Sequence, residues 1–185
     1  IKYKKIININ INKNYIVLRD IKMDFLDKKK VTELKDVLIE NSRTLTISTN
    51  TNNDFPEIGY APYIFTKNVF YIFSSELSPH IKVILKRECG SFMVIQDEKD
   101  TKNIWSRIRM KFNGNIRVIK RNSSKFDEIS NKFEKRHGPT MSVIKPFADF
   151  HLIKINPING SLIVGFGNAY KLDGKNLKIV EHIKN

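Results

Sequence analysis

Residues 44–74, TLTISTNTNNDFPEIGYAPYIFTKNVFYIFS, decide the fold of this chain. Apolar and polar side chains alternate here in short runs, and clusters of turn-forming residues interrupt the runs at Asn50–Asp54 and at Lys67-Asn68. Alternation with a period of two is typical of strands that bury one face. The stretch therefore predicts three strands joined by hairpin-length turns, at Thr44–Thr49, Pro56–Phe65 and Val69–Ser74.

The rest of the chain adds further short strands and a few helices. Apolar residues at helical spacing predict helices at Val31–Asn41, Ser78–Lys86 and Ser123–Arg136, with a helical turn at Thr101–Trp105. Further strands are expected at Ser91–Gln96, at Arg107–Arg121 with a break around Asn113-Gly114, at Phe150–Ile155 and at Leu162–Val164. Asn159-Gly160 predicts a hairpin turn, and Asp173-Gly174 predicts a last tight turn. Many short strands with such turns favour a closed antiparallel barrel over a βαβ sheet.

The length of 185 residues fits one domain. We expect this domain to span residues 23–185, because every recognisable pattern follows Met23, and we treat residues 1–22 as an N-terminal extension of uncertain role. In that extension isoleucine alternates with lysine and asparagine, without the continuous apolar segment of a secretory signal. No run in the chain is apolar over the length that a bilayer requires, so no integral membrane association is expected.

The formal net charge of +14 raises the question of a nucleic-acid partner. The lysines are scattered along the chain and no nucleic-acid-binding motif accompanies them, so we expect none. A basic surface would also attract a small anionic ligand. The single cysteine, Cys89, excludes an intramolecular disulfide and a zinc site built from cysteines. Both exclusions fit a cytoplasmic location.

Four groups of residues carry a resemblance to a known superfamily. They are Thr44–Asn50 with Pro56–Pro62, Phe70–Ser75 with His80–Leu85, Met93–Glu98 with Trp105–Met110, and Ala148–Phe150 with Gly165–Tyr170. In these segments the chain resembles the split β-barrel superfamily of flavin reductases and pyridoxamine-phosphate oxidases, and within it the haem-degrading branch of HugZ-like haem oxygenases. The resemblance covers roughly residues 33–183. It implies a mainly β split barrel with flanking helices, assembled as a homodimer with ligand sites between the protomers.

The function implied by this resemblance is a haem-binding oxygenase that degrades haem and releases iron. Haem then serves as both cofactor and substrate, because its iron activates dioxygen against its own ring. Two alternatives stay open, an FMN-dependent oxidoreductase on the same barrel and a non-catalytic haem storage or delivery protein. The resemblance leaves the electron donor unknown.

Four residues take roles at the haem through this resemblance. His182 lies near the place of the axial iron ligand, but that ligand falls a few residues later in the family. Either His182 serves from a shifted tail or the ligand lies beyond residue 185. Asp149 matches the aspartate that orients this histidine, across the dimer interface. Arg109 matches the arginine on the distal side, where it could donate a hydrogen bond to dioxygen. Arg107, expected on the same strand face as Arg109, could bind a propionate or phosphate.

A second set of residues matches the segment with which FMN-binding relatives hold the flavin phosphate. Ser74, His80 and Lys82 surround an expected helix start at Ser78-Pro79, and the free N–H groups of a helix N-terminus favour an anion. These residues are therefore candidates for binding the anionic groups of haem or FMN. Structural roles, such as capping by serine and a partly buried His80, remain alternatives.

Overall fold

The computed structural model describes residues 27–51 and 55–183. The expectation for residues 1–22 lies outside the described residues. The helices are α1 (Lys28–Asn41), α2 (Pro79–Arg87), α3 (Ser124–His137) and α4 (Thr140–Ile144), with two 3-10 turns, η1 (Glu98–Asp100) and η2 (Ile104–Ser106). The strands are β1 (Thr44–Thr49), β2 (Glu57–Thr66), β3 (Val69–Ser75), β4 (Cys89–Ile95), β5 (Arg109–Val118), β6 (Phe150–Ile163), β7 (Ala169–Asp173) and β8 (Lys178–Ile183).

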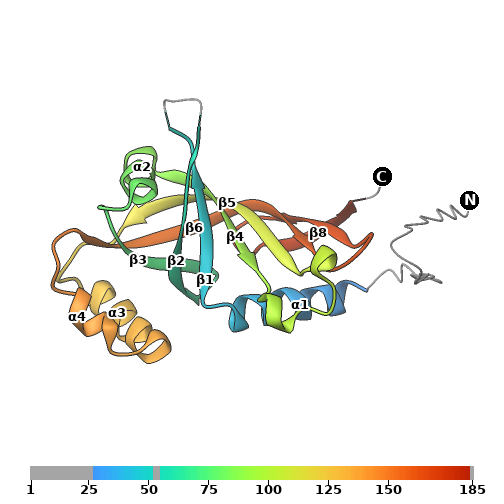
Figure 1. The fold of residues 1–185 in the computed structure, drawn as a ribbon, viewed down its shortest axis with the longest axis horizontal. Helices are drawn as coiled ribbons and strands as arrows, with labels where there is room; N and C mark the ends of the chain where they lie inside the picture. Colours follow the sequence, from blue (N-terminus) through green and yellow to red (C-terminus); the bar gives the residue numbers. More distant parts are fainter. Residues whose placement is uncertain (1–26, 52–54, 184–185) are drawn as a thin grey trace, which may run out of the picture.

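The strands form one antiparallel sheet that closes on itself. Its order is β3-β2-β1-β4-β5-β6-β7-β8, and an additional pairing joins β3 to β6 (Figure 1). A closed barrel is therefore made by six strands, in the order β3-β2-β1-β4-β5-β6. The β7–β8 hairpin extends beyond it. This architecture confirms the barrel that the alternating segments predict.

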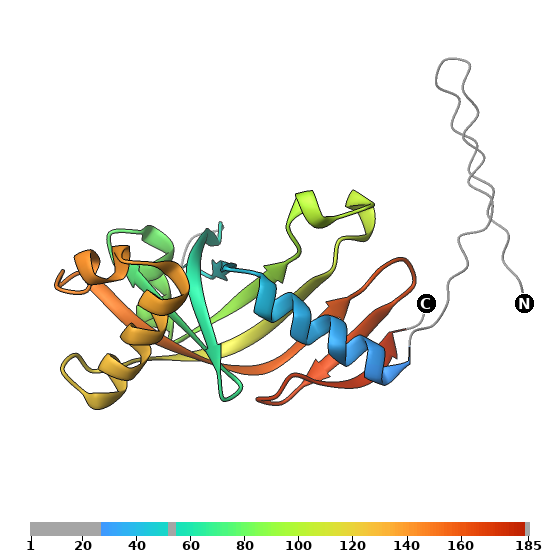
Figure 2. The ribbon, with the colours of Figure 1, turned by 90° about the horizontal axis from the view of Figure 1, so that it is seen from below.

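The barrel splits where strand β6 changes partners along one of its edges. Residues 150–155 pair with β3, whereas residues 159–163 pair with β7. Pro157 lies between these two segments and has no N–H group to donate. The β7–β8 hairpin consequently diverges from the barrel at this point, and it lies at the opposite end of the molecule from α3 and α4 (Figures 1 and 2).

The hairpin turn predicted at Asn159-Gly160 is wrong, because β6 runs without interruption through both residues. The pairing with β5 shifts register between Asn113 and Gly114, so Ile158 is an extra residue opposite this point. A Cβ atom on Gly160 would lie 2.2 Å from the Lys111 carbonyl oxygen. The glycine is thus needed for close approach of two strands at a bulge rather than for a turn.

Two apolar cores hold the elements together. The first fills the barrel and continues under the β7–β8 hairpin, where α1 packs; its members include Val31, Leu38, Phe112, Tyr170 and Leu172. The second lies between the barrel wall and α3 and α4; its members include Tyr71, Phe73, Phe126, Ile129 and Phe133. Helix α2 contributes Ile81 and Ile84 to the first core and closes one mouth of the barrel.

The ends of the helices follow from their sequences. The Asp27 side chain accepts a hydrogen bond from the Lys30 N–H at the start of α1. Helix α3 ends at His137 before Gly138, whose φ of 93° is accessible to glycine at little cost. Lys35 of α1 donates to the Leu177 carbonyl at 3.3 Å and joins the helix to the β7–β8 hairpin. In the described part of the chain, no helix combines the length and apolarity that crossing a membrane requires.

Candidate functional site

The side chains that point away from the barrel core form a concave outer face across β1, β4, β5, β6 and β7. Strand pairing places one residue of each strand side by side in a continuous row, Thr46, Met93, Lys111, Ser161 and Lys171. A hollow of about 800 Å³ opens over this row, and its lining includes all five residues. We call it the outer hollow. Its volume falls in the range of small-molecule sites, which is about 300–1,000 Å³.

A second hollow adjoins the outer hollow on the side of α1. It has a volume of about 640 Å³, and Thr46 and Met93 line both hollows. Its walls are α1 and the segment of residues 96–108 that joins β4 to β5. This joining segment carries η1 and η2, stands out from the sheet (Figure 2), and closes at its base where Gln96 N–H donates to the Ile108 carbonyl at 2.8 Å.

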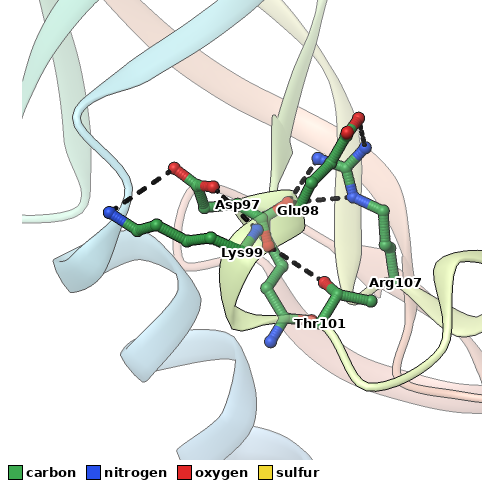
Figure 3. A network of polar contacts seen from close by, with 6 residues as sticks. Asp97, Glu98, Lys99, Thr101 and Arg107 are labelled. Carbon is green, nitrogen blue, oxygen red and sulfur yellow. Dashed lines mark hydrogen bonds and ion pairs between the residues drawn. The ribbon is translucent and has the colours of Figure 1, made fainter.

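Arg107 holds this joining segment in shape (Figure 3). Its Nε and Nη2 atoms donate to the Gln96 carbonyl, and Nη1 donates to Glu98 Oε1 at 2.9 Å. The side chain is only 18% exposed. The expectation that Arg107 and Arg109 share one strand face is wrong, because β5 begins at Arg109 and Arg107 precedes it at the end of η2. The contacts of Arg107 favour a structural role over binding of an anion.

Arg109 lies on the outer face at the beginning of β5. Strand pairing places it between Ile95 and Ile163, and its Nη1 atom donates to the Arg107 carbonyl at 3.0 Å. Lys111 follows two residues later on the same face. Arg109 therefore shares a sheet face with the outer hollow, although it is not among the residues that line it.

His182 belongs to β8 and lies on the opposite face of the sheet from Arg109. Pairing places His182 beside Tyr170, which is buried and belongs to the inner core. The two rings are 4.9 Å apart, and His182 Nε2 lies 2.8 Å from the Gly167 carbonyl oxygen. Because a carbonyl oxygen only accepts, Nε2 carries the proton in the neutral ring and Nδ1 carries the lone pair. Within one chain, His182 and Arg109 do not reach the same surface.

A separate group of polar residues lies at the other end of β6, where β3 leads into α2. The Ser75 hydroxyl donates to Asp149 Oδ2 and accepts from the Leu77 N–H at 3.0 Å. His151 Nε2 lies 2.8 Å from Glu76 Oε2. We call Ser75, Glu76, Asp149 and His151 the α2 cluster. Its polar groups pair with one another, and the two carboxylates stand where an anion was expected to bind.

The candidate anion-binding residues Ser74, His80 and Lys82 lie around this cluster. Ser74 pairs with His151 in the sheet, and Lys82 is exposed on α2. Ser78 occupies the N-cap position of α2, but its side chain makes no capping hydrogen bond. Asp149, expected to orient an axial histidine, accepts from Ser75 instead in this chain. None of these residues lines the outer hollow.

His80 packs against strand β2 at the barrel mouth. A Cβ atom on Gly59 would lie 2.2 Å from His80 Cε1, so only glycine admits the ring at this place. His80 Nε2 is buried without a hydrogen-bond partner among the described residues. Burial lowers the pKa of His80, although the nearby Glu57 carboxylate and a hydrogen bond to the Tyr60 backbone act in the opposite direction. Burial therefore favours the neutral form of this histidine.

Sequence reasoning missed the residues that line the outer hollow. Lys111 follows Arg109 by two positions, and this spacing alone places both on one face of a strand. Lys171 reaches the same row only through the pairing of β5 with β6 and of β6 with β7. That pairing depends on the unbroken β6, which the predicted turn at Asn159-Gly160 would have interrupted.

The fold defines a split-barrel protein, and the outer hollow is a candidate ligand site on the outer face of its sheet. Residues 31–163 match the family model described as pyridoxamine 5'-phosphate oxidase. The chain belongs to this family. The match confirms the superfamily that the sequence motifs indicate.

The similar proteins include several that are named for haem. The chain is 24% identical over 166 residues to "Heme oxygenase HutZ" of Vibrio cholerae, covering 90% of this chain and 94% of that protein. A crystal structure of Vibrio cholerae HutZ, described there as a heme storage protein, has a TM-score of 0.65 at 23% identity, covering 78% of this chain and 96% of that one. The crystal structure of Campylobacter jejuni ChuZ has a TM-score of 0.74 at 26% identity, covering 86% of this chain and 65% of that one. These similarities confirm the resemblance to the HugZ-like branch.

Proposed function

We propose that this chain binds haem at the outer face of its barrel and degrades it, with release of iron. The observation that carries the proposal is the outer hollow, a concavity on the same sheet face as Arg109 in a chain that is similar to a named haem oxygenase. When bound, haem supplies the redox chemistry, because its iron can activate dioxygen against the porphyrin ring. The protein has to bind the ring, orient it and donate hydrogen bonds.

The residues present fit this group. Met93, Ile95 and Ile163 offer apolar contacts on the outer face, and none of them is fully exposed. Arg109 supplies a permanently charged donor whose position is fixed by its hydrogen bond to the Arg107 carbonyl. A fixed donor costs no reorganisation when charge develops on a bound oxygen, so it stabilises a transition state more than a mobile donor does.

His182 is proposed as the residue that would bind the haem iron. A ligating imidazole is usually oriented by a hydrogen bond from its other nitrogen to a carbonyl or a carboxylate. The contact from His182 Nε2 to the Gly167 carbonyl has this form. Because His182 and Arg109 lie on opposite faces of one sheet, a complete site requires His182 from a second copy of the chain. The proposed role of Asp149 near a histidine depends on a second copy in the same way.

The apolar residues beside the outer hollow support a homodimer. Strand pairing places Ile58 next to Ser48 and Tyr60 next to Thr46, and these apolar side chains are 70% and 69% exposed. Large apolar side chains that gather beside a concave face are typical of protein interfaces. We propose that a second copy covers them, and that Ile58→Asp shifts the protein from dimer to monomer in size-exclusion chromatography with light scattering. A wild-type monomer would contradict the dimer.

The activity test is a single-turnover experiment with purified protein. Haemin is added to saturation, followed by ascorbate in air, and the Soret band and released ferrous iron are followed together. Degradation predicts loss of the Soret band with stoichiometric release of iron. Wild-type protein that binds haemin without either change would contradict the oxygenase.

Haem storage or delivery is the second candidate, and a specific observation favours it. The crystal structure of HutZ, which has the fold of this chain, is described as that of a heme storage protein. Storage predicts a stable haem complex whose Soret band persists in ascorbate and air. The cytoplasm, where haem would be used for its iron, is the location we propose for either activity.

An FMN-dependent oxidoreductase is the third candidate, and the contacts of the α2 cluster disfavour it. The Ser75 hydroxyl is already bonded to Asp149, and Glu76 adds a second carboxylate near the start of α2. Like charges close to a phosphate raise the cost of binding it. A purified protein with flavin absorbance would favour this candidate over haem.

A further inference from the structure

We propose that Lys111 and Lys171 form an anion subsite in the outer hollow, which binds the two carboxylates of a flat apolar ligand. The inference rests on the proposed function, in which that ligand is haem and the carboxylates are its propionates. It assigns the anionic end of the ligand to two lysines rather than to Arg107 or to the residues around α2.

The first support is the position of the two lysines. Lys111 of β5 pairs with Ser161 of β6, and Ser161 pairs with Lys171 of β7. Neighbouring strands lie about 4.8 Å apart, so the two backbones are separated by about 10 Å. Both side chains line the outer hollow, with the Ser161 hydroxyl between them. This spacing places two ammonium groups where two carboxylates on flexible arms can each reach one.

The second support is that neither lysine forms an ion pair with a described carboxylate. In residues 27–51 and 55–183, neither lysine lies within 4.0 Å of a carboxylate oxygen. Glu181 pairs with Lys171 in the sheet and Asp173 follows two residues later, yet no ion pair forms. Arg109 adds a third cation on the same face. With the carboxylates of Asp173 and Glu181 counted, three cations face two anions here, and the remaining positive charge favours an anionic ligand.

The third support is the contrast with Arg107. Its guanidinium is already bonded to the Gln96 carbonyl and to Glu98, and it is largely buried. An incoming carboxylate would have to displace those contacts. A lysine ammonium carries three donors on a flexible stem, and it can reorient toward a ligand at small cost.

The fourth support is the lining of the hollow beneath the lysines. Met93 and Ile58 supply apolar side chains to this lining, whereas Phe92, Phe112 and Leu172 point through the sheet into the buried core. Hydroxyl and amide side chains and the Asp173 carboxylate complete most of the lining, with Ser91 and Asn113 bonded to each other at 2.8 Å. Apolar side chains beside two lysines match a ligand with an apolar body and anionic arms.

The experiment compares protoporphyrin IX with its dimethyl ester, which has the same ring without free carboxylates and without iron. Binding to the wild type and to Lys111→Met, Lys171→Met and double variants is followed by porphyrin fluorescence anisotropy at low ionic strength. Lys120→Met, an exposed lysine after the far end of β5, is the matched control. We expect each lysine removal to weaken binding of the dicarboxylate about tenfold, since a charge-assisted hydrogen bond is lost. Binding of the ester should stay unchanged.

The outcomes separate this inference from the proposed function. Equal binding of dicarboxylate and ester by the wild type, or discrimination that persists in the double variant, would overturn the subsite. A double variant with a changed oligomeric state would also overturn it, because the lysines would then hold subunits together. Failure of haemin degradation alone would overturn the oxygenase and leave the porphyrin result intact. We expect FMN to bind more weakly than protoporphyrin IX. Tighter binding of FMN would mean that the two lysines bind a phosphate group instead of two carboxylates, which would overturn the inference.

Discussion

The outer hollow and the α2 cluster are both rich in polar residues, but they differ in how those residues are paired. In the α2 cluster Ser75 bonds to Asp149 and His151 to Glu76, so the hydrogen-bonding groups satisfy one another. In the outer hollow Lys111 and Lys171 face a concavity without an ion pair in the described structure. A polar group that is already paired loses its partner when it binds a ligand, whereas an unpaired cation gains one. The comparison therefore favours the hollow over the cluster as the place where a ligand would make direct contact.

Among the variants, the greatest change is expected at Arg109. Arg109→Leu removes a fixed donor beside the hollow, and losing one preorganised donor typically costs about 100-fold in rate. Haemin binding should persist while the rate of Soret loss in ascorbate and air falls by about that factor. Arg117→Leu, an exposed arginine near the far end of β5, is the control and should keep the wild-type rate. Equal rates for wild type and Arg109→Leu would show that Arg109 does not take part in the reaction.

His182 and His151 provide the next comparison, because both histidines have a hydrogen-bond partner but only His182 is proposed as a ligand. His182→Ala should shift the Soret maximum of the haemin complex and weaken binding about tenfold, since an axial bond is lost. His151→Ala should change neither quantity. Absorption titrations of the two variants measure this, and a shift in His151→Ala alone would reverse the assignment.

Arg107 should affect stability and leave the discrimination between porphyrin dicarboxylate and ester unaltered. Arg107→Ala leaves the Gln96 carbonyl without its donor and frees residues 96–108, so unfolding free energy should fall by about 2 kcal/mol. Urea denaturation followed by circular dichroism measures the change. Glu98→Gln, at a side chain that is 72% exposed, should cost less than 1 kcal/mol, as exposed ion pairs contribute about 0–1 kcal/mol. Loss of the discrimination in Arg107→Ala would show that Arg107 binds the ligand.

A smaller stability effect is expected within the α2 cluster. Ser75→Ala removes one partly buried hydrogen bond to Asp149 and should lower the free energy of unfolding by about 1 kcal/mol. Haemin affinity should stay at the wild-type value, because the cluster binds no ligand in this account. Urea denaturation measures the stability and a haemin titration on the same preparation measures the affinity. A tenfold change in haemin affinity would show that the α2 cluster takes part in binding.

The smallest effect concerns the pH dependence contributed by His80. Burial lowers its pKa in the folded chain below the ordinary value of 6.5, so the unfolded chain binds more protons as the pH falls through that value. The stabilising contribution is therefore present above pH 6.5 and is lost on acidification toward the lowered pKa. Burial also lowers the pKa of His137, which adds a loss of the same sign. Urea denaturation of wild type and His80→Gln at pH 7.5 and 5.5 should show that the variant loses less unfolding free energy on acidification. An equal loss in both proteins would show that His80 does not contribute to the pH dependence.

The sequence predicts local elements well because short-range patterns determine them. Alternation in residues 44–74 leads to β1, β2 and β3, and the Pro79 and Gly138 signals bound α2 and α3 where they are found. The predicted turn at Asn159-Gly160 is wrong for a long-range reason, since pairing of β6 with β5 and β7 outweighs the local turn propensity. The placement of Arg107 before β5 depends on its bonds to Gln96 and Glu98, which no local pattern encodes.

The candidate site also depends on strand pairing that local sequence patterns do not encode. Arg109 and His182 are found from motifs, yet their opposite faces emerge only from the pairing of four strands, β5 to β8. The outer hollow depends on a row of residues that are far apart in the sequence, from Thr46 to Lys171. Individual scattered lysines carry no signal of this kind in a chain with 33 basic residues.

The most direct test is the dissociation constant of haemin for two matched double variants, Lys111→Met/Lys171→Met in the outer hollow and Ser74→Ala/Lys82→Met beside α2. We expect the first variant to lose about 100-fold in affinity, tenfold for each lysine, and the second to bind like the wild type. Unchanged affinity in the first variant with a large loss in the second would place the ligand beside α2 and contradict the account.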